Sequence, residues 1–317
     1  MTISPPEPRT DQPPELPPPE ARQSPRAIAW ARRRRALRGY WHVYRRNKQG
    51  MIGLFILLLF IGLALAAPLL VDETQLTPAG STGVPFSPPS SEYPLGTDNF
   101  GRPVGGLLIY GARISLLVGL TATVGTMLIG SVVGIASGYY GGRIDTLLNA
   151  FTNWFLVIPR IALAIVLASI WGPSLGTIIV VIAITSWAGT ARLVRAQALT
   201  VKERLYVERS QALGAGSWHM VTRHILPNVF PVIMANAVLT VALAILSETT
   251  LALLGLGDPN SVSWGTIIEE SFNAGALSAG YWWWLIPPGI AIVFVTLSFT
   301  MCGYALDEIM NPRLRER

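Results

Sequence analysis

One arrangement in this sequence is typical of nucleophilic catalysis, and we interpret it as a chance match. Gly172-Pro173-Ser174-Leu175-Gly176 fits the G-x-S-x-G pattern that presents a reactive serine on a sharp turn. Such a serine needs a neighbouring base. We expect Ser174 at the outer face of a membrane, whereas His42, His219 and His224 are expected on the inner side, about 30 Å of hydrocarbon away. An intramembrane serine protease is therefore not predicted.

Other catalytic and cofactor chemistry also finds no support in the residues. No segment fits G-x4-G-K-[ST], so this chain is not expected to hold ATP phosphates by itself. The single cysteine, Cys302, lies in an apolar run and cannot form an intrachain disulfide. One cysteine and three scattered histidines predict no metal cluster. We predict no catalytic residue, no metal and no cofactor bound by this chain.

Glu248 is the one acid in the middle region of an apolar span. An ionised acid at that depth costs about 2.5–3.5 kcal/mol, so it should face a partner or a water-filled cavity. It could be a pathway or gate residue, or it could make a structural cap or interhelix hydrogen bond beside Thr249 and Thr250. Gly255 and Gly257 suggest that the helix ends soon afterwards, which favours the structural role.

The elements that must position these residues are membrane helices. Charged residues make up 13% of the 317 residues, about half the usual share of roughly 25%, and the apolar residues form continuous rather than alternating runs. The formal net charge is +6, but eleven of the 24 basic residues fall in the first fifty positions, where they act as an orientation signal. No nucleic acid partner is expected. The runs predict six spans: 51–70, 113–137, 146–170, 174–190, 228–256 and 284–306.

The predicted organisation places both termini in the cytoplasm of a bacterium, with the chain crossing its inner membrane several times. A cleaved signal peptide ending at Ala64-Leu65-Ala66 is the weaker alternative, because the basic region before it is too long. Trp282 to Trp284 are expected in an interfacial aromatic belt. The segments are a Pro-rich disordered tail (1–25), a basic amphipathic surface segment (26–50), the first span (51–70), an extracytoplasmic loop (71–111), a five-helix core (112–306) that contains the loop 191–227, and a cytoplasmic tail (307–317).

Three glycines recur at every fourth position in the second span. Gly130, Gly134 and Gly138 lie along one helix face and let a second helix approach closely. We interpret them as helix-packing residues rather than as part of a pore.

The polar segment 191–227 interrupts the apolar runs. Its charges place it on the cytoplasmic side, with two acids, Glu203 and Glu208, against six basic residues: Arg192, Arg195, Lys202, Arg204, Arg209 and Arg223. We predict a short helix over 203–213, a break at Gly214-Ala215-Gly216, and a second helix from an N-cap at Ser217 to Leu226, with Pro227 starting the next span. A rigid helix–glycine–helix of this kind is suited to docking a soluble partner.

This segment resembles the EAA loop of the inner-membrane permease subunits of binding-protein-dependent ABC importers. Glu208 matches the glutamate, Gly214 follows at the expected distance, and Leu226-Pro227 close the motif. Arg209 and Ser210 replace the usual alanines and His224 replaces an isoleucine, which implies a more polar docking surface. The similarity continues, in order, through further stretches typical of the dipeptide/oligopeptide/nickel branch and its "C" type subunit: Leu95–Asp98, Tyr110–Leu116, Gly138–Asp145, Leu253–Gly257, Ser263–Gly265 and Asn311–Arg313.

The resemblance implies an all-α membrane protein with the type I ABC importer permease fold. It implies a second related permease subunit, two ATPase subunits or domains that bind ATP and Mg, an extracytoplasmic solute-binding protein, and a lipid membrane as partners. The coupling residues carried over are Glu208, Ala212, Leu213, Gly214, Leu226 and Pro227. Di- or oligopeptides are the expected solutes, with nickel, glutathione or another small solute of the branch as alternatives.

Two other classes remain as hypotheses. A secondary transporter driven by an ion gradient would be expected to carry several intramembrane acids or broken helices. A membrane scaffold or sensor would leave the docking segment unexplained. The permease subunit, which is not itself an enzyme, is the prediction.

Overall fold

The computed structural model describes residue 30, residues 38–39 and residues 41–310. The chain divides into two compact units, Met1–Val43 and Tyr44–Arg317, and each is considered by itself. In the first unit the described residues are helical. The predicted tail 1–25, most of the predicted surface segment 26–50 before position 41, and the stretch 311–317 lie outside the described residues.

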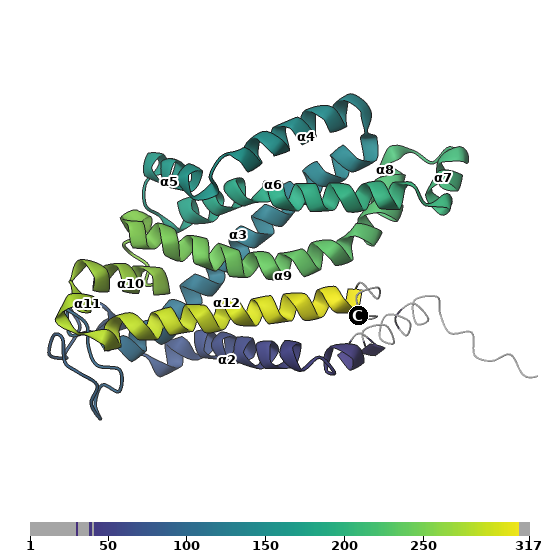
Figure 1. Ribbon diagram of the computed structural model, residues 1–317. Helices are drawn as coiled ribbons and strands as arrows, with labels where there is room; N and C mark the ends of the chain where they lie inside the picture. Colours follow the sequence, from purple (N-terminus) through teal and green to yellow (C-terminus); the bar gives the residue numbers. More distant parts are fainter. Residues whose placement is uncertain (1–29, 31–37, 40, 311–317) are drawn as a thin grey trace, which may run out of the picture. The chain divides into compact units, whose positions relative to one another are not determined.

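The second unit is a bundle of helices (Figure 1). Extended pairing in the described part of the chain is limited to one bridge between Thr97 and Pro103. The elements are α2 (Lys48–Leu70), η1 (Glu73–Leu76), α3 (Val104–Tyr140), α4 (Gly142–Val157), α5 (Arg160–Trp171), α6 (Leu175–Lys202), α7 (Leu205–Ala212), α8 (Ser217–Met220), η2 (Val221–Ile225), α9 (Leu226–Leu251), η3 (Ala252–Leu256), α10 (Trp264–Asn273), α11 (Ala276–Ala279) and α12 (Trp282–Met310).

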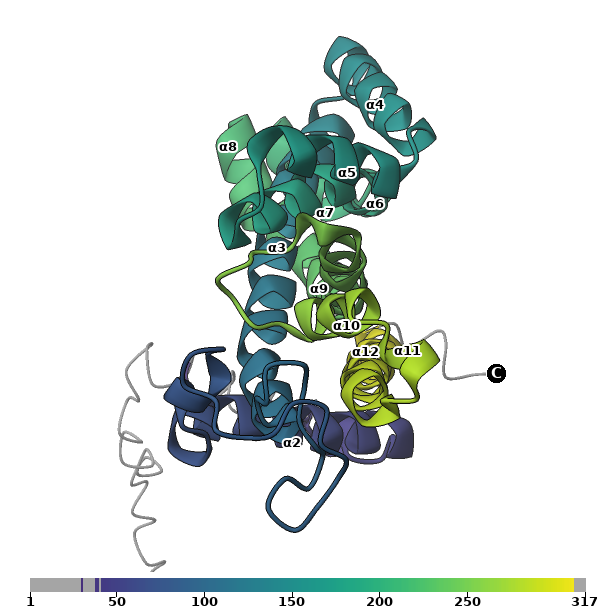
Figure 2. The ribbon, with the colours of Figure 1, turned by 90° about the vertical axis from the view of Figure 1, so that its left-hand side faces the viewer.

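Close helix approach at glycine holds α3 against α6. A Cβ added to Gly130 would lie 2.6 Å from the Cβ of Thr190, and one added to Gly134 would lie 2.6 Å from the carbonyl oxygen of Ala191. Gly138 meets Ala198 in the same way, at 2.8 Å. Within lipid, such contacts replace the hydrophobic effect as the force between helices. Figure 2 shows α3 beside α6 and α9, with α2 and α12 at the other edge of the bundle from α4.

The predicted third span, 146–170, is not a straight helix. It is divided into α4 and α5, whose axes differ by 88°. The break falls at Ile158 and Pro159, and Ile158 is extended, with φ −72° and ψ 128°. Proline provides no N–H and disfavours helical geometry in the residue before it. The structure therefore has five helices long and apolar enough to span a membrane in its described part, or six if the bent pair is one span.

The helix that follows the docking segment is interrupted by two π-helical turns. The turn η2 joins α8 to α9 and η3 follows α9, so the helical path runs from Ser217 to Leu256. Gly255 has a positive φ of 76° inside η3. Each π turn accommodates one more residue than an α-turn. The helical path reaches Leu256, the end of the predicted span 228–256, because η3 continues it beyond Leu251.

The end of the unit opposite α7 is closed by the loop 71–103 and by α10 and α11, and we call it the loop end. The helix α3 begins at Val104, whereas the loop was predicted to continue to 111. Trp284 is fully buried and Trp283 donates from Nε1 to the carbonyl oxygen of Thr97, at 3.2 Å. These two tryptophans therefore pack under the loop and are not part of an interfacial belt, although Trp282 is exposed. At the other terminus α12 continues through Met310, past the predicted boundary at 307.

The middle of the bundle exposes large apolar side chains. They include Phe55 and Leu59 on α2, Leu128 and Val132 on α3, and Val293 on α12. A soluble protein rarely exposes such extensive apolar surface, whereas lipid accepts it. The fold is that of an all-α integral membrane protein.

Candidate functional site: an exposed helix–glycine–helix segment

The segment predicted to dock a partner forms a compact projection beyond the spans. After α6 ends at Lys202, the chain turns at Glu203 and Arg204 and enters α7. Val207 on α7 is fully buried and belongs to one apolar cluster with Val201, Met220 and Ile225. Sequence reasoning missed these buried side chains as anchors, although their spacing on short helices would have indicated an inward face.

A glycine turn connects α7 to α8. Gly214 has a φ of 86°, a conformation that side chains with a Cβ rarely adopt. Its N–H donates to Gln211 O at 2.9 Å, and the N–H of Ala215 donates to Ser210 O at 3.1 Å. These bonds satisfy the last carbonyls of α7. The N-cap of α8 is Gly216, so the prediction that Ser217 caps this helix is wrong: Ser217 is its first residue.

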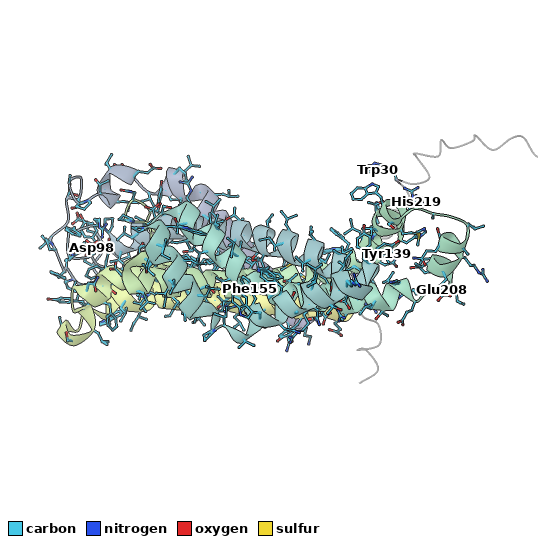
Figure 3. The ribbon with its side chains drawn as sticks, turned by 90° about the horizontal axis from the view of Figure 1, so that it is seen from above. Trp30, Asp98, Tyr139, Phe155, Glu208 and His219 are labelled. Atoms are coloured by element: carbon cyan, nitrogen blue, oxygen red, sulfur yellow. The ribbon has the colours of Figure 1, made fainter. Side chains whose placement is uncertain are left out.

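The outer face of this segment carries the predicted coupling residues. Glu208, Ala212 and Gly214 are exposed, and Leu213 is 89% exposed. Trp218, which was not predicted, is 79% exposed beside them. Figure 3 shows Glu208 and His219 at this end of the unit and Asp98 at the opposite end. Two large apolar side chains on a polar projection are typical of a surface that binds another protein.

His224 occupies the position where the resemblance predicts an isoleucine, and its surroundings are polar. The Nε2 atom of His224 lies 3.4 Å from Ser210 Oγ, so residues from both sides of the glycine turn meet. The rings of Tyr206 and His219 lie 5.9 Å and 5.7 Å from that of His224. The aromatic and hydroxyl groups around His224 therefore link α7 to η2.

Leu226 and Pro227 begin α9 and are both exposed. In the sequence they close the docking motif and are among the predicted coupling residues. The fully buried positions here are Ile225 and Val229, because the π turn η2 directs Ile225 inward. Pro227 is accommodated in the first turn of α9, where a missing N–H costs little.

A bidentate ion pair joins α4 to α6 near this end. Nε and Nη2 of Arg195 donate to the two carboxylate oxygens of Asp145, at 2.6 Å and 2.7 Å. Ser137 on α3 also donates to Asp145. Asp145 was noted only within the Gly138–Asp145 stretch, and the pairing with a residue fifty positions away gave no local signal. Fork-like pairing of this kind fixes orientation as well as adding energy.

Glu248 lies apart from the projection, at the contact between α9 and α10. It is 2% exposed, and its Oε1 accepts a hydrogen bond from Ser263 Oγ at 2.6 Å. Ser263 also caps α10, through a reciprocal pair of hydrogen bonds with Thr266. Glu248 Oε2 has no hydrogen-bond partner among the described residues. This arrangement favours the interhelix interpretation of Glu248 over a position on an open pathway.

The loop end contains an acidic cavity of about 630 Å³ that sequence reasoning did not predict. Its lining includes Glu73, Asp258, Glu269 and Glu270, together with Arg102. Arg102 is buried and paired with both Asp98 and Glu270. Burial raises the pKa of the Glu270 carboxyl above its usual range, and the Arg102 charge opposes the shift.

Ser174, the serine of the G-x-S-x-G match, caps α6. Its Oγ accepts from the N–H of Thr177 at 3.1 Å. The serine is therefore at a helix N-terminus, and His219 and His224 lie on α8 and η2 at the α7 end of the unit. Among the described residues, no group of three or more His, Cys, Asp or Glu could hold a metal ion.

A long helical membrane unit with an exposed helix–glycine–helix projection defines a polytopic membrane protein built to contact a soluble partner. Residues 130–316 match the family described as the binding-protein-dependent transport system inner membrane component. Residues 36–89 match the N-terminal transmembrane domain of oligopeptide transport permease C. The chain belongs to the permease family of binding-protein-dependent ABC importers.

Individual relatives cover most of the chain. The dipeptide transport system permease protein DppC of Bacillus subtilis (strain 168) is 36% identical over 87% of this chain and 85% of its own length. The oligopeptide transport system permease protein OppC of the same organism is 35% identical over 86% of this chain and 88% of its own length. A solved structure, an inward-facing conformation of the MetNI methionine ABC transporter, shares the fold with a TM-score of 0.53 at 20% identity, covering 66% of this chain and 96% of that chain.

Proposed function

We propose that this chain is one of two transmembrane subunits of an ATP-driven importer of di- or oligopeptides. The relatives named above are dipeptide and oligopeptide permeases that match nearly the whole chain. The observation that carries the proposal is the projection around Gly214. It exposes Leu213 and Trp218 while Val207 and Met220 fix it to the bundle.

In the proposed mechanism, ATP and Mg are bound and used by two partner ATPase subunits or domains, and this chain performs no hydrolysis. Glu208, Ala212, Leu213 and Gly214 dock on the ATPase. Because α8 continues through η2 into α9, a displacement of the docked segment moves the spanning helix with it. Two arrangements of the helices, biased by nucleotide, suffice for alternating access.

The proposed orientation puts the α7 end in the cytoplasm of a bacterium, together with both termini. Basic residues exceed acidic ones in 191–227, whereas 257–283 contains Asp258, Glu269 and Glu270 and no basic residue. That asymmetry follows the positive-inside rule. The loop end then faces the extracytoplasmic binding protein, which delivers the solute to it. The second permease subunit is a related chain, which makes the membrane part a heterodimer.

Uptake by proteoliposomes that contain the purified complex, with ATP enclosed and the binding protein and solute added outside, tests the proposal. We expect uptake of a radiolabelled dipeptide to require ATP and the binding protein, and to persist when an ionophore dissipates the ion gradients. Purification in mild detergent should recover a second permease and ATPase subunits. Uptake that follows an ion gradient without ATP would contradict the importer, and competition by Ni²⁺ but not by peptides would contradict the substrate class.

A further inference from the structure

The break between α4 and α5 places an arginine on the surface of the bundle. Arg160 is the first residue of α5 and directly follows Pro159. It is exposed, and it lines a cavity of about 160 Å³ between α5, α6 and α9. None of the ion pairs found in the described part of the chain involves Arg160.

The depth of this cavity follows from the residues around it. Ser186 and Thr190 come from the middle of α6 (Leu175–Lys202), and Asn236 and Thr240 from the middle of α9 (Leu226–Leu251). Both helices are long and apolar enough to span a membrane. Arg160 is therefore a cation at mid-span. Ionisable residues at that depth face a partner or a water-filled space, because hydrocarbon does not solvate them.

The cavity wall is polar on both helices. Asn236 Nδ2 donates to Thr190 Oγ1 at 3.1 Å, and Thr240 Oγ1 donates to the carbonyl oxygen of Asn236 at 2.8 Å. Ser186, Asn236 and Thr240 are all partly exposed. Polar groups of this kind, presented together with a cation, fit an aqueous passage and do not fit contact with lipid.

We propose that Arg160 and this cavity form an anion-binding station on the solute pathway, which takes the C-terminal carboxylate of the transported peptide. The inference rests on the proposed function and names the solute group that the membrane part recognises. Arginine offers a fork of donors that matches a carboxylate. The N-terminus of α5 contributes partial positive charge at the same place. A metal cation would be repelled here, so the station favours peptides over nickel.

Uptake of a dipeptide and of its C-terminal amide by the reconstituted complex tests the station. The wild-type complex should prefer the free carboxylate. Arg160→Gln should lower uptake of the free dipeptide roughly ten- to hundredfold, the effect of losing a charged hydrogen-bond pair, and should abolish the preference. Arg160→Lys should keep part of it. Arg143→Gln, which removes an exposed charge on α4, should leave uptake and preference unchanged. An unchanged preference in Arg160→Gln would overturn the station.

Thiol labelling tests the aqueous pathway without any solute. In a Cys302→Ser background, Arg160→Cys and Thr240→Cys should react with a membrane-impermeant maleimide added from one side of the vesicles. Leu59→Cys, at mid-span on the apolar face of α2, should stay unreactive. If Arg160→Cys and Thr240→Cys are as unreactive as Leu59→Cys, the inference is wrong. A wild-type complex without ATP-driven peptide uptake would instead contradict the proposed function, and labelling would then decide the pathway alone.

Discussion

At the scale of single residues, Gly214 holds the docking segment in a conformation that few other residues adopt. Its φ of 86° is left-handed, while a Cβ at this position would meet no atom within 4 Å. The penalty of a substitution therefore comes from backbone conformation, about 1–2 kcal/mol, and from whatever the new side chain presents to the partner.

We expect Gly214→Asp to insert normally and to lose ATP-driven uptake, because the turn is strained and a charge enters the docking surface. Gly216→Asp is the matched control, since Gly216 is equally open but has a φ of −69°. Uptake in vesicles and the amount of purified complex are the measurements. Normal uptake by Gly214→Asp would remove the docking assignment.

Glu270 makes the stability of the loop end depend on pH. Burial raises the pKa of Glu270 in the folded state, so this carboxyl holds its proton to higher pH than it does in the unfolded chain, where its pKa is about 4.3. Its stabilising contribution is complete below that value and is lost as the pH rises through the folded pKa.

The thermal unfolding midpoint of the wild type in detergent should therefore fall as the pH rises from about 4.3 through the folded-state pKa of Glu270. In Glu270→Gln the midpoint should change less with pH over the same range. Glu92→Gln, at an exposed position of the loop 71–103, should retain the wild-type slope. A slope that is identical in Glu270→Gln and the wild type would contradict the assignment.

At the scale of elements, the contact between α3 and α6 depends on the absence of side chains. Gly134→Val should destabilise the protein by about 1–3 kcal/mol, because its Cβ would lie within 2.7 Å of the Cβ of Val194. Gly62→Val on α2, where no atom lies within 4 Å of an added Cβ, should have little effect. Unfolding midpoints in detergent provide the comparison, and equal midpoints would show that the helices separate without cost.

The contact between α9 and α10 depends on Ser263. Ser263→Ala removes the cap of α10, which costs about 0.5–2 kcal/mol, and leaves both carboxylate oxygens of Glu248 buried without a donor. Ser174→Ala removes an exposed cap and nothing else. We expect the first substitution to lower the denaturation midpoint more than the second, and the reverse order would contradict the role given to Glu248.

The helices could be predicted from the sequence wherever a continuous apolar run alone determined their position. Continuous apolar runs located five of the spans, and the short connection between α5 and α6, Gly172 to Ser174, lies where the predicted spans 146–170 and 174–190 meet. The 146–170 run failed because apolar composition hid Pro159, which breaks the helix. The predicted span 228–256 ends where the helical path ends, at Leu256, but the π turn η3 over its last residues had no signal in the apolar run.

The site was predictable in its position and not in its contacts. The glycine and the charges of 191–227 indicated an exposed helix pair, whereas the burial of Val207 and Met220 depends on residues of α3, α6 and α9. The ion pair between Arg102 and Glu270 joins the loop 71–103 to α10, which is distant in sequence. The hydrophobic periodicity of the sequence does not indicate such a contact. Arg160 could have been identified from the sequence as a candidate site residue, because it is a cation inside an apolar run beside a proline.

At the scale of the whole molecule, the two ends of the unit should lie on opposite sides of the membrane. In a Cys302→Ser background, Leu213→Cys places a single thiol at the α7 end. Ser81→Cys places a single thiol in the loop 71–103. An impermeant reagent should label Ser81→Cys in right-side-out vesicles and Leu213→Cys in inside-out vesicles. Labelling of both from the same side would refute the proposed topology.

The π turn η2 has a consequence for how this segment could change over evolutionary time. Val221–Ile225 hold one more residue than an α-turn requires, so deletion of a single codon there would restore a regular helix. Because the π turn carries the extra residue within a single turn, this deletion would leave the parts before and after it in register, with neither rotated about the helix axis. One mutational event would thus make the connection to the membrane core a regular helix while Leu213 and Trp218 stay exposed on the docking segment.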